Sequence, residues 1–254
     1  MPAELINVTE VSAWGGSARV AAEMARLLAA GVRTLPADVT AAEVIEALNG
    51  PDALACVLPT GNAAVDDRSW RVAAATTKPV VLVPPGATLN HPHVERVLVP
   101  LDGSQEVADA MGPMAGLLRR AGVELVVLHV FEPDTVPAFW DQRAHANDAW
   151  AHAFAARSGA PPGTQTELRR GLPALQVVRT AVLEDVDLIA FGWSGARSVA
   201  RAQTVRGSVA AAPMPVLLQQ RSVGELERRG LNAKRGDWLL SHAGNETHPA
   251  QRAR

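Results

Sequence analysis

This chain of 254 residues has a single cysteine, a small net charge and only short apolar runs. Its one cysteine, Cys56, lies in an apolar run and has no partner for a disulfide within the chain, so we expect a small core residue. The net charge of -2 is too small to attract a phosphate backbone, which argues against a nucleic-acid partner.

Segments that direct a chain to a membrane or across one are also missing. The longest apolar runs, 79–85 and 124–131, are far shorter than the roughly 20 residues that a membrane helix needs. No basic segment precedes an apolar stretch at the start of the sequence, as it would in a signal peptide. We therefore expect a soluble, cytoplasmic protein with no membrane partner.

Known catalytic motifs are absent. The sequence has no G-x-S-x-G nucleophile turn, no Walker Gly-Lys-Ser/Thr and no G-x-G-x-x-G after an expected strand. The two lysines, Lys78 and Lys234, lie outside loops from which they could reach a nucleotide phosphate. We predict no catalytic residue and no enzymatic activity.

The histidines do not form a metal site. His145 and His152 are two helical turns apart, a gap of about 10 Å, which is too wide for one metal ion without further donors. His91 and His93 have no cysteine near them. We expect solvated histidines on the helix, or histidines packed on Trp150, and no metal.

Between residues 95 and 220, short β-branched segments alternate with stretches of helical periodicity. We expect strands at 95–102, 123–131, 164–171, 187–193 and 215–220, with helices between them. This alternation is typical of an α/β fold with a parallel sheet. The strands 79–85 and 215–220 are expected at exposed sheet edges, where unpaired backbone groups favour pairing with another strand.

The first ninety residues read as a shortened copy of the second half. Segments 32–36 and 40–50 match the third strand and third helix of that half, so one strand-helix unit, the counterpart of 124–131 and its helix, is missing. The Pro-rich stretch 84–93 is a natural joint. We therefore predict domains at 1–90 and 91–220, followed by a disordered tail at 221–254, whose composition has few periodic apolar positions.

Four segments of the second half resemble the universal stress protein family: VLVPLDGS (97–104), LVVLHV (125–130), DLIAFGWSG (187–195) and PMPVLL (213–218). The resemblance covers 95–220 well and 1–90 loosely. It implies two open, Rossmann-like parallel sheets of the adenine-nucleotide alpha-hydrolase type. It further implies the strand order 3-2-1-4-5 in the second half, with a crevice beside the first and fourth strands.

In nucleotide-binding members of that family, an aspartate and a valine help to seat adenosine, and glycines with a serine hold the phosphates. The matching positions here are Asp102, Val130, Gly192, Gly195, Gly207 and Ser208. Each also has a purely structural interpretation. Asp102 can cap a helix, Val130 can simply end a buried strand, and glycines permit a tight strand-to-helix turn.

The spacing of the last two positions departs from the family pattern. Eleven residues separate Gly195 from Gly207, where the family has nine, and only four residues follow Ser208 before Pro213. Four residues make about 6 Å of helix, too little for a parallel crossover. We predict a helix that starts near residue 198 or 199, contains Gly207 and Ser208, and uses the glycine for a close helix-sheet contact. Trp193 could either fill the crevice or stack on an adenine.

Three functional hypotheses remain. The first is a non-enzymatic universal stress-like protein with a degenerate ATP motif and no cofactor. It would act by self-association through edge strands, by pairing of its own two domains, or by binding an unidentified protein. The second is a stress sensor that binds ATP in the second domain. The third, an acyl-adenylate-forming enzyme, lacks the expected phosphate loop after 97–102. In the first half, Glu10 and the turn 59–62 do not match a nucleotide site.

Overall fold

A computed structural model describes residues 4–8, 15–36, 39–61, 67–137, 140, 144–160, 163–193 and 199–220. The predicted tail 221–254, as well as Glu10 and Gly195, lies outside these residues. Within them, no helix is both long enough and apolar enough to cross a membrane.

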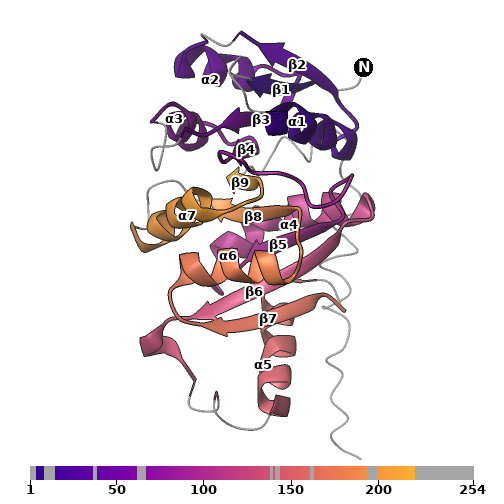
Figure 1. The fold of residues 1–254 in the computed structure, drawn as a ribbon. Helices are drawn as coiled ribbons and strands as arrows, with labels where there is room; N and C mark the ends of the chain where they lie inside the picture. The colour runs from indigo at the N-terminus through magenta and orange to yellow at the C-terminus, as the bar shows by residue number, and fades with distance from the viewer. Residues whose placement is uncertain are drawn as a thin grey trace, which may run out of the picture. The chain divides into compact units, whose positions relative to one another are not determined.

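In its described residues, the first half has four strands and three helices in alternation (Figure 1). In chain order they are β1 (Glu4–Val8), α1 (Gly15–Leu27), β2 (Gly31–Leu35), α2 (Ala41–Asn49), β3 (Ala53–Pro59), α3 (Asp67–Ala75) and β4 (Val80–Val83). The start of α2 follows from its sequence: Thr40 and Glu43 form a capping box, in which each side chain accepts a hydrogen bond from the other residue's backbone N–H. Cys56 in β3 is fully buried, which confirms the predicted core role, and burial raises the pKa of its thiol.

The second half begins with β5 (Arg96–Pro100), α4 (Gln105–Arg120), β6 (Glu124–Phe131) and a short 3-10 helix, η1 (Pro133–Thr135). It continues with α5 (Ala144–Arg157), β7 (Gln165–Arg170), α6 (Pro173–Leu183), β8 (Leu188–Trp193), α7 (Val199–Ala211) and β9 (Val216–Gln220). The strands pair in the order β7-β6-β5-β8-β9, all of them parallel. This is the predicted order 3-2-1-4-5, which is confirmed.

Both halves share one nine-stranded sheet, ordered β2-β1-β3-β4-β9-β8-β5-β6-β7. The halves meet where β4 and β9, the last strand of each, pair antiparallel, with Val81 opposite Leu217 at the centre. Both strands are almost completely buried. Each strand therefore satisfies the backbone edge of the other within a single chain.

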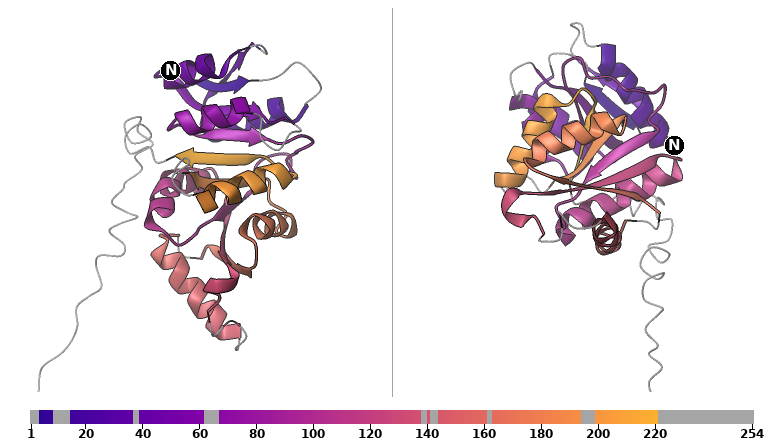
Figure 2. Two further views of the ribbon diagram at one scale, coloured as in Figure 1. Left: turned by 90° about the vertical axis from the view of Figure 1, so that its left-hand side faces the viewer. Right: turned by 60° about the horizontal axis from the view of Figure 1, so that its bottom comes forward.

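Helices cover both faces of this sheet (Figure 2). On one face, side chains of α2, α3, α6 and α7 join one buried apolar cluster that runs across both halves, with Val44, Trp70, Val177 and Val205 among its members. The opposite face of β8 packs against α4, as the surroundings of Gly192 show below.

The position of β2 differs from the predicted correspondence. The segment 32–36 matches the third strand of the second half in sequence, yet β2 is hydrogen-bonded directly to β1, with Val32 opposite Leu5. Beside β5, the same place is taken by β6, the second strand. Periodicity identifies a strand but carries no information on its neighbour, so β2 can match the third strand in sequence and still take the place beside β1 that the second strand takes beside β5.

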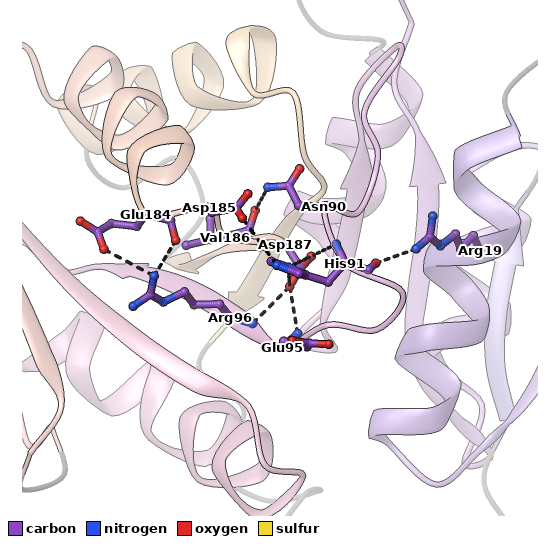
Figure 3. Close-up of polar contacts among 9 residues, drawn as sticks. All are labelled: Arg19, Asn90, His91, Glu95, Arg96, Glu184, Asp185, Val186 and Asp187. Atoms are coloured by element: carbon purple, nitrogen blue, oxygen red, sulfur yellow. Dashed lines mark hydrogen bonds and ion pairs between the residues drawn. The ribbon is translucent and has the colours of Figure 1, made fainter.

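The segment after β4 is held to the second half by the buried carboxylate of Asp187 (Figure 3). This carboxylate accepts hydrogen bonds from the backbone N–H groups of His91 at 2.8 Å, Glu95 at 2.9 Å and Arg96 at 3.2 Å. The His91 ring lies 3.1 Å from it through Nδ1, and this contact raises the pKa of His91. A fully buried carboxylate with this many donors fixes the path of the chain between the halves.

The same segment is tied to α1 of the first half. Arg19 donates to the carbonyl of His91 at 2.6 Å (Figure 3), and Glu23 lies 2.8 Å from Nδ1 of His93. Burial alone would raise the pKa of Glu23, but its hydrogen bonds to His93 and Arg26 outweigh burial and hold it below the usual range. The histidines that had no metal partners in the sequence thus hold the joint between the halves.

Candidate functional site

The parallel pairing of β5 with β8 brings the carboxyl ends of both strands to one edge of the sheet. Asp102 follows β5, and Gly192 lies near the end of β8. Val130, near the end of β6, is partly buried against the apolar cluster that spans both halves. Asp102, Val130 and Gly192 therefore lie at the ends of adjacent strands, as the resemblance implied.

Asp102 is engaged by two other side chains. Its Oδ1 accepts hydrogen bonds from the backbone N–H of Ser104 at 2.9 Å and from the Ser104 hydroxyl at 2.6 Å. Its Oδ2 accepts from Nε of Arg201 at 3.0 Å and also from Nη2 of Arg201. Burial alone would raise the pKa of Asp102, but the hydrogen bonds from Ser104 and Arg201 outweigh it, so the pKa is lowered. The helix cap itself is Ser104, whose hydroxyl accepts from Val107 N–H.

Arg201 was not singled out by the sequence, although it links α7 to the loop after β5. Besides Asp102, it approaches Glu106 at 3.8 Å and donates to the Ser104 hydroxyl at 3.3 Å. Only 19% of its side chain is exposed. The guanidinium of Arg201 is therefore already paired with the carboxylate of Asp102, the residue that corresponds to the adenosine-seating position of the family.

Gly207 and Ser208 lie inside α7, four residues or fewer from its end at Ala211, which confirms the predicted helix. Ser208 is fully buried, and its carbonyl accepts the N–H of Ala212 at 2.8 Å. Inside a helix, N–H groups bond to the preceding turn and are not available to an anion.

The predicted helix-sheet contact at Gly207 is wrong, because the partner is another helix. A Cβ added at Gly207 would lie 2.9 Å from Cβ of Ala174 in α6, closer than real Cβ atoms approach. The glycine therefore allows α6 and α7 to pack closely, a contact between residues far apart in the sequence.

Gly192 has a structural role of the same kind. A Cβ there would lie 2.9 Å from Cγ1 of Val107 and 3.0 Å from its carbonyl oxygen, both in α4. The absence of a side chain thus lets α4 approach β8, which accounts for this glycine without any ligand. Its partner in the Gly-x-x-Gly turn, Gly195, lies outside the described residues.

The side chain of Trp193 is buried. It is only 3% exposed, and its ring packs against Trp70 of α3, with the ring centroids 5.7 Å apart. Arg206 of α7 lies over the other indole, 5.3 Å from the Trp70 ring centroid. The two tryptophans thus join the halves within the shared apolar cluster.

An aromatic cluster lies beside the loop after β5. The ring centroid of His129 in β6 lies within 5.1 Å of the ring centroids of Phe131, Trp150 and Phe154. Its Nδ1 donates a hydrogen bond to the carbonyl of Leu101 at 2.9 Å. Burial lowers the pKa of His129. His129 therefore packs on Trp150, while His152 is exposed, in agreement with the predicted solvated histidine.

Comparison with known proteins finds a family match in the second half. Residues 93–218 match the model of the universal stress protein family. A universal stress protein from Archaeoglobus fulgidus has a similar structure, with a TM-score of 0.56, 17% identity and coverage of 87% of each chain. A functionally unknown protein from Pseudomonas aeruginosa PAO1 aligns with a TM-score of 0.58 and 14% identity over 86% of this chain and 92% of its own. At these identities the two likenesses establish the fold alone. No curated protein matches the sequence.

Proposed function

Because residues 93–218 carry a universal stress protein domain, we propose that the protein acts in the stress response without enzymatic activity, by associating with itself or with a protein partner. In this proposal the nucleotide motif is degenerate and no cofactor is bound.

The position of Gly207 and Ser208 carries the proposal. Both residues belong to α7, where their backbone N–H groups lie within a hydrogen-bonded helix rather than at its start. A phosphate site of the family type needs such groups free and pointing at the ligand. The ion pair between Asp102 and Arg201 supports the same conclusion, because a nucleotide would have to displace it.

The surface available for association depends on which strands of the sheet are already hydrogen-bonded on both sides. β4 and β9 are hydrogen-bonded to each other, so neither offers its backbone to another molecule. The two ends of the sheet are β2 and β7. We propose that association uses these ends and the helices beside them.

The alternative is an adenine-nucleotide sensor that uses the second half. Asp102 favours it, because a carboxylate with a lowered pKa follows the first strand of that half, at the family position. In this case Arg201 would have to release Asp102 when ATP binds.

Thermal unfolding with and without Mg-ATP tests the proposal. A ligand at about 100 times its Kd stabilises the folded state by about 2.7 kcal/mol, which raises Tm by several degrees in a chain of this size. The proposal predicts no shift of Tm. A shift in the parent chain that is absent from Asp102→Ala would instead support the sensor.

A further inference from the structure

Strand β7 forms one end of the sheet and has an open backbone edge (Figure 1). It pairs in parallel with β6 on one side, and no strand in the described part of the chain pairs with the other. Gly171 donates to the carbonyl of Phe131 at 2.9 Å, so alternate residues from Gly171 backwards face β6. The backbone groups of Thr166, Leu168 and Arg170 therefore point to the open side, where they can pair with another strand.

The charges on β7 have opposite signs on the two sides of Leu168. Glu167 precedes it, Arg169 follows it, and the two side chains pair at 2.7 Å. Alternate residues of a strand share a face, and this face is the one that α6 covers, because Gln165 bonds to Glu184 at the end of α6 at 2.9 Å. A strand with this pattern is complementary to an antiparallel copy of itself, since reversal about Leu168 places each sign opposite the other.

Backbone geometry restricts the registers of such a pair. In an antiparallel ladder, residues whose backbone groups point to the partner lie opposite each other, so two copies of β7 can shift only in steps that keep outward residues paired. When Leu168 lies opposite Leu168 of the second copy, Glu167 lies opposite Arg169 on both sides of the two-fold axis. The neighbouring register in one direction places Glu167 opposite its own copy, and the neighbouring register in the other direction does the same with Arg169. Like charges directly opposite destabilise a pair, so the charges select the register centred on Leu168 from these three.

The same pairing would cover apolar side chains. Helix α6 follows β7 after a link of two residues, and a two-fold axis perpendicular to the sheet keeps both copies of α6 on one face, on either side of the new strand pair. Leu168 and Leu183 line a cavity of about 400 Å³ beside β7, which the second copy would cover. Of the five exposed large hydrophobic residues among those described, four lie on α6 or at its N-cap: Leu172, Leu175, Val182 and Leu183. Several on one helix form a patch typical of a binding surface.

We propose that two copies of the chain associate through β7, as an antiparallel two-fold pair centred on Leu168. The two nine-stranded sheets then form one continuous sheet, joined in the way that β4 and β9 join the halves within a chain. Glu167 and Arg169 of both copies alternate in sign across this joint. The inference rests on the proposed function, association of the protein with itself or with a partner, and names the partner as a second copy and the surface as β7.

Sedimentation equilibrium of the full chain at micromolar to millimolar concentrations tests this pairing. We expect the mass to rise with concentration to twice 26.7 kDa. Glu167→Arg and Arg169→Glu each replace two pairs of opposite charge by two pairs of like charge, so each should weaken the dimer by about tenfold or more. Arg119→Glu makes the same charge change at an exposed position of α4 and should dimerise like the parent.

Mixing the two charge-reversed chains identifies the register. One chain then carries arginine at both positions and the other carries glutamate at both, so every pair across the joint is again of opposite charge. We expect the mixture to form a heterodimer with an affinity near that of the parent dimer, a rescue that a folding defect in either chain could not produce. A monomeric parent at millimolar concentration, unweakened dimers of the single variants, or a mixture that stays monomeric overturns the proposal.

The proposed function fails by a different measurement. A monomeric parent removes the pairing through β7 but leaves association with another protein in place. A Tm shift on addition of Mg-ATP to the same preparation contradicts the proposed function, whatever mass the chain has.

Discussion

Arg201 on α7 donates hydrogen bonds from both Nε and Nη2 to a single oxygen of Asp102, which lies two residues after the end of β5. The contact joins residues 99 positions apart. It places a fixed positive charge where the family motif alone would suggest a free carboxylate, and it adds to the hydrogen bonds from Ser104 that keep the pKa of Asp102 low despite partial burial.

Removing that guanidinium should raise the pKa of Asp102. In Arg201→Ala, the carboxylate keeps its bonds to Ser104 but loses those from Arg201, so its pKa moves up. Because 44% of the Asp102 side chain is exposed, solvent screens the pair, and the loss of stability should stay below about 1 kcal/mol. A carboxyl NMR titration and urea unfolding measure the two effects. Gln203→Ala, at an exposed position of the same helix, is the control, and an unchanged Asp102 pKa in Arg201→Ala would refute the contact.

A methyl group at Gly192 should destabilise the protein. Gly192→Ala puts a Cβ 2.9 Å from Val107, and we expect a cost of about 1–3 kcal/mol as α4 moves away from β8. Gly112→Ala in α4 is the control, because a Cβ there has nothing within 4 Å and should gain up to about 1 kcal/mol from helix propensity. Urea unfolding of both variants measures these effects. An unchanged free energy of unfolding in Gly192→Ala would contradict the packing role of Gly192.

The contact between α6 and α7 predicts that the effect of Gly207→Ala on stability changes sign when Ala174 is replaced by glycine. Gly207→Ala should destabilise the chain, because its Cβ would lie 2.9 Å from that of Ala174. In the background Ala174→Gly the obstacle is gone, and the same substitution should stabilise α7 by about 1 kcal/mol through helix propensity. A double-mutant cycle in urea measures this coupling. Additive effects in the cycle would show that the two residues do not touch.

His91 should make stability depend on pH. Its pKa is raised in the folded protein by the bond to Asp187, with Asp185 and Glu95 adding to the effect. A raised folded-state pKa means that the stabilisation is complete below the unfolded value of about 6.5 and is lost as the pH rises through the folded value. His91→Gln should therefore lower the urea midpoint more at about pH 5.5 than at about pH 9. An equal loss at both pH values would mean that the charge on His91 does not contribute.

The sequence predicts the second half well because the apolar runs and helical repeats there are local signals. β5, β6, β8 and β9 each coincide with an expected strand, and the start of α7 follows from the short distance between Ser208 and Pro213. By contrast, the place of β2 depends on which strand it pairs with, and periodicity does not encode pairing. The contacts of Arg201 with Asp102, Trp193 with Trp70 and Gly207 with Ala174 likewise join distant segments, so no local pattern could reveal them.

NMR of the backbone amides of Gly207 and Ser208 during a titration with Mg-ATP tests the central claim most directly. Since both amides lie within α7, they should keep their chemical shifts and their slow hydrogen exchange at saturating nucleotide. Saturable shifts of these two amides, lost in Asp102→Ala, would contradict the account and establish a phosphate site in the second half.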